Sequence, residues 1–151
     1  MQNNQQVLVG AVGWNCPHWS GGFYPEDLPE EWMLSYYNTQ FQAVYVPAAI
    51  WLSASGPTWE QWLVDTQDDF CFVLEPAGEN ALPSSSERVL LASPAWEKQC
   101  VWWLDESPDL RALAQRITQQ AKAGIPLFVF SRTGNLTLLQ QVSSLKLVMG
   151  Y

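Results

Sequence analysis

Short runs of apolar residues, separated by stretches with helical spacing, organise this sequence. The runs are rich in β-branched and aromatic side chains and lack polar alternation, as expected for strands that are buried on both faces. We predict strands over residues 7–12, 43–46, 70–74, 101–104 and 128–130, and a short one over residues 89–92.

The stretches between these strands carry signals for helix ends. Residues 29–31, Pro-Glu-Glu, predict a helix start, because proline fits the first turn and acids stabilise the positive end of the helix dipole. Thr58 and Gln61 have capping-box spacing, and Ser107 before Pro108 predicts another N-cap. Gly124 is placed to end that helix. We also expect a last helix over residues 136–142, followed by a final strand over residues 145–149.

The alternation of strands and helices predicts an α/β fold with a mainly parallel sheet of about five or six strands and flanking helices. A closed barrel of this kind has eight strands and typically needs at least about 200 residues, whereas this chain has 151. We therefore expect a reduced or incomplete TIM-like barrel. Residues 1–151 form one domain in this interpretation, with a flexible tail over residues 1–6 and a loop over residues 76–86.

The loop after the first strand holds an unusual concentration of rings. Glycines and prolines punctuate it, yet it carries four aromatic side chains and the only histidine: Trp14, His18, Trp19, Phe23 and Tyr24. These rings either stack a planar or sugar-like ligand or plug the mouth of the sheet. We expect the loop to lie over the C-terminal ends of the strands, with Trp14 against the core and Trp19 or Tyr24 partly exposed.

The same stretch carries a family resemblance. Gly-Ala-Val-Gly-Trp at residues 10–14, then Trp19, then Phe-Tyr-Pro at residues 23–25, resembles the opening of the YecE-like family, a domain-of-unknown-function family of TIM-barrel proteins. Further matches follow in the expected order through about the first half of the chain. The resemblance implies a TIM-like barrel and does not imply an activity, because that of the family is not established.

This chain departs from the family pattern at the ends of its strands. The resemblance implies a carboxylate and an amide in the second strand, where this chain has Val-Tyr-Val-Pro at residues 44–47. The resemblance implies a lysine at the end of the third strand, where this chain has Glu75. It implies an Asn-Asn pair after the last strand, where this chain has Ser131 and Arg132. We interpret the chain as a shortened and divergent member whose missing units fall between Glu75 and Ser107.

Charge and composition exclude several functions. With a net charge of -8 and seven lysines plus arginines, the chain lacks the clustered cations that nucleic acids and anionic membranes require. We find no signal peptide and no apolar run of transmembrane length, so the expected location is cytoplasmic. The three cysteines, Cys16, Cys71 and Cys100, are widely spaced and are expected to be free thiols.

No motif predicts a catalytic centre or a cofactor. Cys16 and His18 have no second Cys or His cluster to complete a metal site, so no metal is expected. Asp105 and Glu106 end a strand on the side where parallel sheets bind ligands and form the better candidate acid pair, although a structural role is favoured. Nucleotide-binding glycine motifs and a nucleophile elbow are absent from the sequence.

We therefore expect a non-catalytic or vestigial binding or interaction protein, with no catalytic residue and no cofactor. An unclosed barrel leaves its inner face and two strand edges open to water, which predicts a homodimer or another protein partner. The contact is expected at sheet faces, at sheet edges or on a surface around Trp51, Trp59, Trp102 and Trp103. The alternative is a small-molecule-binding protein or enzyme whose pocket, at the C-terminal strand ends, is lined by Trp14, His18, Trp19, Tyr24, Tyr45, Trp51, Glu75 and Asp105.

Overall fold

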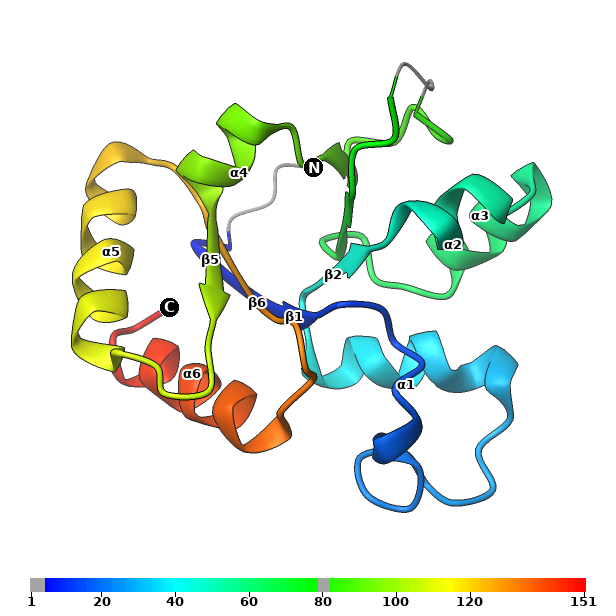
Figure 1. Cartoon of the computed structure of the whole chain (residues 1–151), viewed down its shortest axis with the longest axis horizontal. Helices are drawn as coiled ribbons and strands as arrows, with labels where there is room; N and C mark the ends of the chain where they lie inside the picture. The colour runs from blue at the N-terminus through cyan, green and yellow to red at the C-terminus, as the bar shows by residue number, and fades with distance from the viewer. Residues whose placement is uncertain (1–4, 79–81) are drawn as a thin grey trace.

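The computed structural model describes residues 5–78 and 82–151 (Figure 1). Strands and helices alternate through these residues, as the sequence predicted. The order is β1 (Val7–Ala11), α1 (Met33–Gln40), β2 (Ala43–Val46), α2 (Ala48–Ser53), α3 (Gly56–Val64), β3 (Cys71–Leu74), β4 (Val89–Leu91), α4 (Pro94–Cys100), β5 (Val101–Leu104), α5 (Leu110–Ala123), β6 (Leu127–Ser131) and α6 (Leu136–Val148). Two short 3-10 turns, Pro17–Trp19 and Glu30–Trp32, precede α1.

The strands form two parallel three-stranded sheets, ordered β1-β6-β5 and β2-β3-β4. The sheets meet where β1 lies beside β2: the Gln42 N–H donates to the Val9 carbonyl at 3.1 Å, and the Gly13 N–H donates to the Tyr45 carbonyl at 2.8 Å. The six strands therefore make one continuous array in the order β5-β6-β1-β2-β3-β4. The predicted fold class, a mainly parallel and incomplete TIM-like barrel with flanking helices, is confirmed.

A tyrosine side chain occupies the seam between the two sheets. The Tyr37 hydroxyl, from α1, accepts a hydrogen bond from the Ala11 N–H at 2.8 Å and donates one to the Ala43 carbonyl at 2.7 Å. Gly10 makes room for this arrangement, because a Cβ there would lie 1.9 Å from the Ala43 oxygen. Between β1 and β2 the hydroxyl thus takes the place of a direct backbone hydrogen bond, which interrupts the regular ladder.

Alternate residues of all six strands meet on the inner face of this curved array. Their side chains form one apolar cluster: Leu8, Ala43, Tyr45, Cys71, Val73, Leu90, Val101, Trp103, Phe128 and Phe130. Trp96 of α4 packs on this cluster, with its ring centroid 5.2 Å from that of Phe128. Most of these side chains are buried within the single chain. The expectation that an unclosed array leaves its inner face open to water is therefore wrong, because the rings are large enough to cover it.

The array has its two free edges at β4 and β5. In the part of the chain that the structure describes, β4 pairs only with β3 and β5 pairs only with β6. The segment that joins β4 to β5 contains α4. It is the shortest of the connections in which a helix links two strands. This opening lies within residues 75–107, the segment where the family resemblance places the missing barrel units.

The opposite faces of the strands pack under the helices. Figure 1 shows α5 and α6 beside β5 and β6, and α1, α2 and α3 on the other side of the molecule beside β2. This outer core includes Trp51 and Trp59, both buried. These two rings therefore do not contribute to the tryptophan-rich surface that the sequence predicted, whereas Trp102 and Trp103 are partly exposed.

Two helices begin at residues other than those predicted. The N-cap of α3 is Ser55, whose hydroxyl accepts from the Thr58 N–H at 3.3 Å, so Thr58 lies inside the helix. The N-cap of α5 is Asp109, whose carboxylate accepts from the Ala112 N–H at 3.0 Å, and Ser107 lies before it. A carboxylate is the stronger acceptor for these first N–H groups. Gly124 ends α5 in the left-handed conformation, as predicted.

The sequence also misjudged short and terminal elements. The strand predicted over residues 145–149 is wrong, because Leu145 to Val148 continue α6 and the Met149 N–H donates to the Leu145 carbonyl at 3.0 Å. The helices α2 and α4 were not predicted. Residues 1–4 and 79–81, which belong to the expected tail and loop, lie outside the described residues. Gln5 and Gln6 are held by hydrogen bonds to Asp69 and to the Ile125 carbonyl.

Candidate functional site

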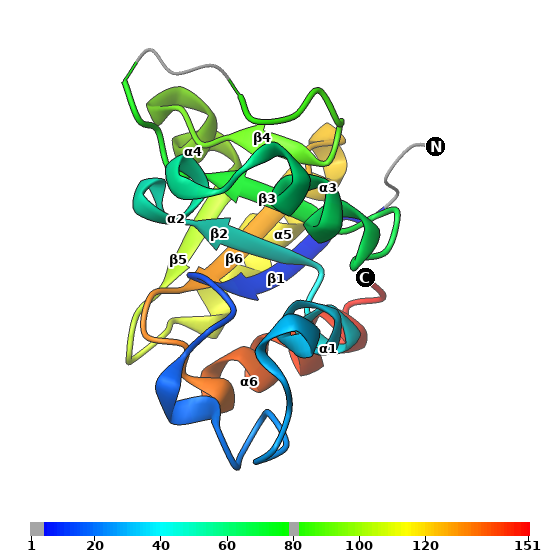
Figure 2. The same cartoon turned by 90° about the vertical axis from the view of Figure 1, so that its right-hand side faces the viewer.

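The structure divides the eight predicted pocket residues among three places. Four lie in the loop after β1, Tyr45 and Glu75 lie at the C-terminal ends of β2 and β3 with Trp51 of α2 beside them, and Asp105 follows β5. The first group is set apart from the others, because the loop after β1 leaves the strand ends. Figure 2 shows this loop, in dark blue, running alongside α1 and the start of α6.

Trp19 and Tyr24 belong to the core. Trp19 is 0% exposed and Tyr24 is 1% exposed, so the prediction that at least one of them is partly exposed is wrong. The Trp19 ring lies among the rings of Phe23, Tyr37 and Phe41, and its Nε1 donates to the Gly134 carbonyl at 2.8 Å. The loop therefore covers α1 and the start of α6 instead of the strand ends, because α1 offers the larger aromatic surface.

The other two loop residues are more accessible. Trp14 is partly buried against the core, as predicted, with its ring edge-on to Trp62 of α3 at 4.9 Å. Its carbonyl accepts a hydrogen bond from the Tyr24 hydroxyl. His18 is exposed, and its Nε2 lies 3.3 Å from the Gly134 carbonyl. These contacts hold the loop in place and bring no reactive pair together.

Trp51 and Glu75 join the ends of β2 and β3. The Nε1 of Trp51 donates to the Glu75 carbonyl at 2.9 Å. The Glu75 carboxylate accepts from the Ala48 N–H at 2.9 Å, at the first residue of α2. A carboxylate at this position stabilises the start of the helix. Glu75 therefore has a structural task in the place where the family resemblance implies a lysine.

The remaining strand-end residue, Tyr45, lies beside groups that the sequence did not indicate as a site. Its ring is edge-on to Trp103 of β5 at 5.0 Å. The guanidinium carbon of Arg132, which follows β6, lies 3.7 Å above the Trp103 ring. The Nε1 of Trp103 donates to the Glu97 carboxylate of α4 at 3.0 Å. We call Tyr45, Glu97, Trp103 and Arg132 the strand-end cluster.

Sequence reasoning missed this cluster because its members come from four separate elements. The available signal was weak: Trp103 and Arg132 stand near the ends of predicted strands, and Arg132 replaces an amide of the family pattern. Glu97 could not be predicted to belong to the cluster, because α4 itself was not predicted. Parallel topology then brings the ends of β2, β5 and β6 to one side of the array.

The electrostatics of the strand-end cluster favour a protonated tyrosine. Burial raises the pKa of Tyr45, the carboxylates of Glu97 and Glu75 raise this pKa further, and Arg132 opposes them. The hydroxyl therefore stays neutral at physiological pH, as a hydrogen-bond donor and acceptor. Arg132 is exposed and has no hydrogen bond or ion pair to another described residue. The cluster can stack and hydrogen-bond a ligand, but it holds no activated nucleophile.

Asp105 and Glu106, the candidate acid pair, organise loops. The Asp105 carboxylate accepts from the Ser107 N–H at 3.2 Å, within its own turn. The Glu106 carboxylate accepts from the Thr133 hydroxyl at 2.9 Å and from the Asn135 side-chain amide at 3.2 Å. These bonds tie the loop after β5 to the loop after β6.

The thiols are free, as predicted for Cys16, Cys71 and Cys100. Burial raises the pKa of the Cys16 and Cys100 thiols, which keeps them protonated and weakly nucleophilic at neutral pH. Within residues 5–78 and 82–151, no three His, Cys, Asp or Glu side chains are grouped so that they could hold a metal ion. In the same residues, no helix is both long and apolar enough to span a membrane.

Comparison with known proteins finds a family that the first half of the chain resembles. Residues 8–77 match the family model described as protein of unknown function DUF72. The fold is similar to the crystal structure of a DUF72 family protein from Thermotoga maritima, with a TM-score of 0.65 and 14% sequence identity over 94% of this chain and 100% of that chain. No curated protein matches the sequence. The predicted resemblance is confirmed over residues 8–77, because YecE-like and DUF72 name the same family.

Proposed function

We propose that this protein is a non-catalytic member of its family and acts by binding another protein chain. One observation carries the non-catalytic part of the proposal: the carboxylates near the strand ends each serve as acceptors in a structural hydrogen bond. Glu75 caps α2, Glu97 accepts from Trp103, and Asp105 closes its own turn. Each of these carboxylates holds part of the fold in place, which favours a structural role over that of a general acid or base.

The filled interior of the array supports the same proposal. The rings of Tyr45, Trp103 and Phe130 are in mutual contact, with centroid distances of 5.0 to 5.8 Å. In barrel enzymes the substrate contacts polar groups at the C-terminal ends of the strands. Here large apolar side chains occupy the inner face up to that end, which favours a structural core over a substrate pocket.

Ligand screening by thermal unfolding tests the non-catalytic role. Sugars, nucleotides, organic acids and amines are added one at a time to the wild type, to Arg132→Ala and to the control Arg111→Ala, which removes an exposed arginine from α5. We expect no compound to raise the Tm of the wild type in a way that depends on Arg132. A compound that stabilises the wild type and Arg111→Ala, but not Arg132→Ala, contradicts the proposal.

A second candidate function is the binding of a small anionic ligand at the strand-end cluster. The exposed Arg132 guanidinium favours it, because Arg132 stacks on Trp103 and pairs with no described carboxylate. Arginine recognises carboxylates and phosphates through paired N–H groups, and the partly exposed Trp103 ring adds a flat apolar contact. A compound that stabilises the wild type and Arg111→Ala, but not Arg132→Ala, would support this function and contradict the first proposal.

A further inference from the structure

The outer face of α6 carries no charge. Its exposed side chains are Thr137, Gln140, Gln141, Ser144, Leu147 and Val148, which we call the uncharged face. Leu147 and Val148 are 75% and 87% exposed, although they are aliphatic. Depletion of charge together with exposed aliphatic side chains is typical of the centre of a protein interface.

The single charged residue of α6 points away from this face. The Lys146 ammonium donates to the Val7 carbonyl at 2.8 Å and to the Gln42 side-chain oxygen at 3.2 Å, at the edge of β1. Desolvation lowers the pKa of Lys146, in agreement with its partly buried position. The face that α6 presents to solvent is therefore polar and aliphatic along its whole length.

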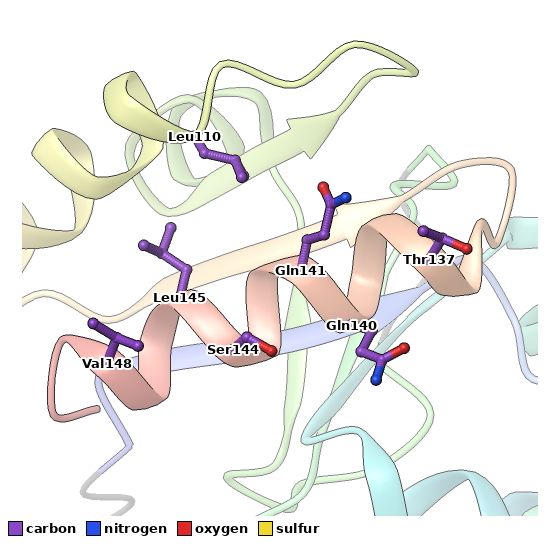
Figure 3. Close-up of a pocket in the computed structure, with 7 residues that line it drawn as sticks. All are labelled: Leu110, Thr137, Gln140, Gln141, Ser144, Leu145 and Val148. Carbon is purple, nitrogen blue, oxygen red and sulfur yellow. The ribbon is translucent and has the colours of Figure 1, made fainter.

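Two grooves widen this face on either side of α6. The first, of about 490 Å³, has Leu110, Leu145 and Val148 as its apolar lining, and Figure 3 shows Gln141 and Leu145 on the side of α6 that faces Leu110. The second, of about 440 Å³, lies toward the loop after β1 and the end of α1, with Phe23 and Phe41 in its lining. Neither groove is lined by a charged residue.

We propose that the uncharged face binds a second copy of this chain, with α6 packed against α6 of the partner across a two-fold axis. This inference rests on the proposed protein-binding function and names its partner. Residues near a two-fold axis face their own copies, so each must be complementary to itself. Gln140, Gln141 and Ser144 meet this condition, because amides and hydroxyls both donate and accept hydrogen bonds. A charged side chain at such a position would face its own charge.

The charge of the whole chain also favours this face for self-association. Each copy carries a net charge of -8, so two copies repel each other in most orientations. Contact through the uncharged face brings no carboxylate of α6 against another carboxylate. A partner recruited by opposite charge would instead require acidic groups on the contact surface.

The area of the face suits a weak dimer. A helix with the 13 residues of α6 is about 20 Å long and about 10–12 Å across, and the two grooves widen the face on both sides. A specific dimer has to bury a total of about 1,200 Å², or about 600 Å² per copy, so the contact must extend from the helix into both grooves. Area alone does not set affinity, and a face with only two exposed aliphatic side chains has few anchors, so we expect a Kd in the micromolar range.

Sedimentation equilibrium over micromolar to submillimolar concentrations tests the dimer. We expect the mass of the wild type to rise from 17.1 kDa toward twice that value. The variant Gln140→Glu/Gln141→Glu places two carboxylates per copy at the axis and should raise the Kd at least about tenfold, with partial recovery at high salt. The control Gln115→Glu/Gln119→Glu adds the same charge to exposed positions of α5 and should leave the Kd within about twofold.

Each result decides one statement. Equal weakening by both double variants, with circular dichroism showing that both remain folded, overturns the assignment of the surface. A wild-type mass of 17.1 kDa at every concentration overturns the second copy as partner. That second result leaves the non-catalytic role standing, because the role is tested separately by ligand screening.

Discussion

The Tyr37 hydroxyl is the group whose removal should most sharply test how the two sheets are joined. The substitution Tyr37→Phe deletes one oxygen atom and keeps the ring, which is fully buried and stacks against Trp19. Two backbone groups lose their partner at once: the Ala11 N–H, which donates to the hydroxyl, and the Ala43 carbonyl, which accepts from it. Both lie in buried strands, where water cannot replace the hydroxyl without displacing the surrounding side chains.

The expected loss of stability follows from these two groups. Each buried backbone group left without a hydrogen bond costs about 1 to 3 kcal/mol, so the free energy of unfolding should fall by about 3 kcal/mol. Domains of this size are stable by about 5 to 15 kcal/mol, so the variant should fold with a clearly lower denaturation midpoint. Relief by a shift of β1 toward β2 is blocked by the close approach at Gly10.

Urea unfolding, followed by tryptophan fluorescence and by circular dichroism, measures this loss. The matched control is Tyr36→Phe, which removes a hydroxyl from the neighbouring, partly exposed tyrosine of α1. The control should change the free energy of unfolding by less than about 0.5 kcal/mol. If Tyr37→Phe were as stable as this control, the hydroxyl would not be bridging the two sheets and our account of the seam would be refuted.

Three further predictions concern backbone space, pH and capping. Gly10→Ala should destabilise by more than about 3 kcal/mol or prevent folding, because its Cβ would overlap a carbonyl oxygen of β2, whereas Gly56→Ala, with open space around it, should be tolerated in the same urea assay. Burial raises the pKa of Tyr24 and Tyr37, so these hydroxyls ionise in the unfolded chain, above about pH 10, before they ionise in the folded one. The free energy of unfolding should therefore fall above about pH 10, by up to about 1.4 kcal/mol per pH unit for Tyr37. A urea midpoint that is unchanged between about pH 9 and about pH 11 would contradict this. Asp109→Ala should cost about 1 kcal/mol by removing the N-cap of α5, and an unchanged Tm would contradict that role.

Local signals in the sequence were sufficient for the strands and for most helices. The buried strands are short β-branched runs whose bounds are almost those predicted, and β2 and β5 agree at both ends. Helix ends were less certain because several capping residues compete within one loop. Ser107 and Asp109 both lie near the start of α5, and in the structure the Asp109 carboxylate caps the helix while the Ser107 N–H donates to Asp105.

The candidate site was harder to predict because it depends on contacts between distant residues. Trp19 looked like a surface ring because it stands in a loop, but its burial depends on Tyr37 of α1 and on Phe41, the residue that follows this helix. Tyr45 was chosen for its place at a strand end, yet the groups that surround it come from α4, β5 and the loop after β6. Sequence spacing contains no information on which of these elements meet.

The filling of the inner face explains how so short a barrel remains a single folded chain. A complete barrel covers its interior with side chains from eight strands, whereas here six strands and α4 must do so. The inner positions of β6, which lie at the centre of the β1-β6-β5 sheet, are Phe128 and Phe130, and both rings are buried. The Phe128 ring packs on Trp96 of α4, the helix that joins the free-edge strands β4 and β5. Because this interior is covered within one chain, an exposed apolar surface has to be sought on the outer layer, where Val148 and Leu147 of α6, with Val64 of α3, are the most exposed large apolar side chains of the described helices.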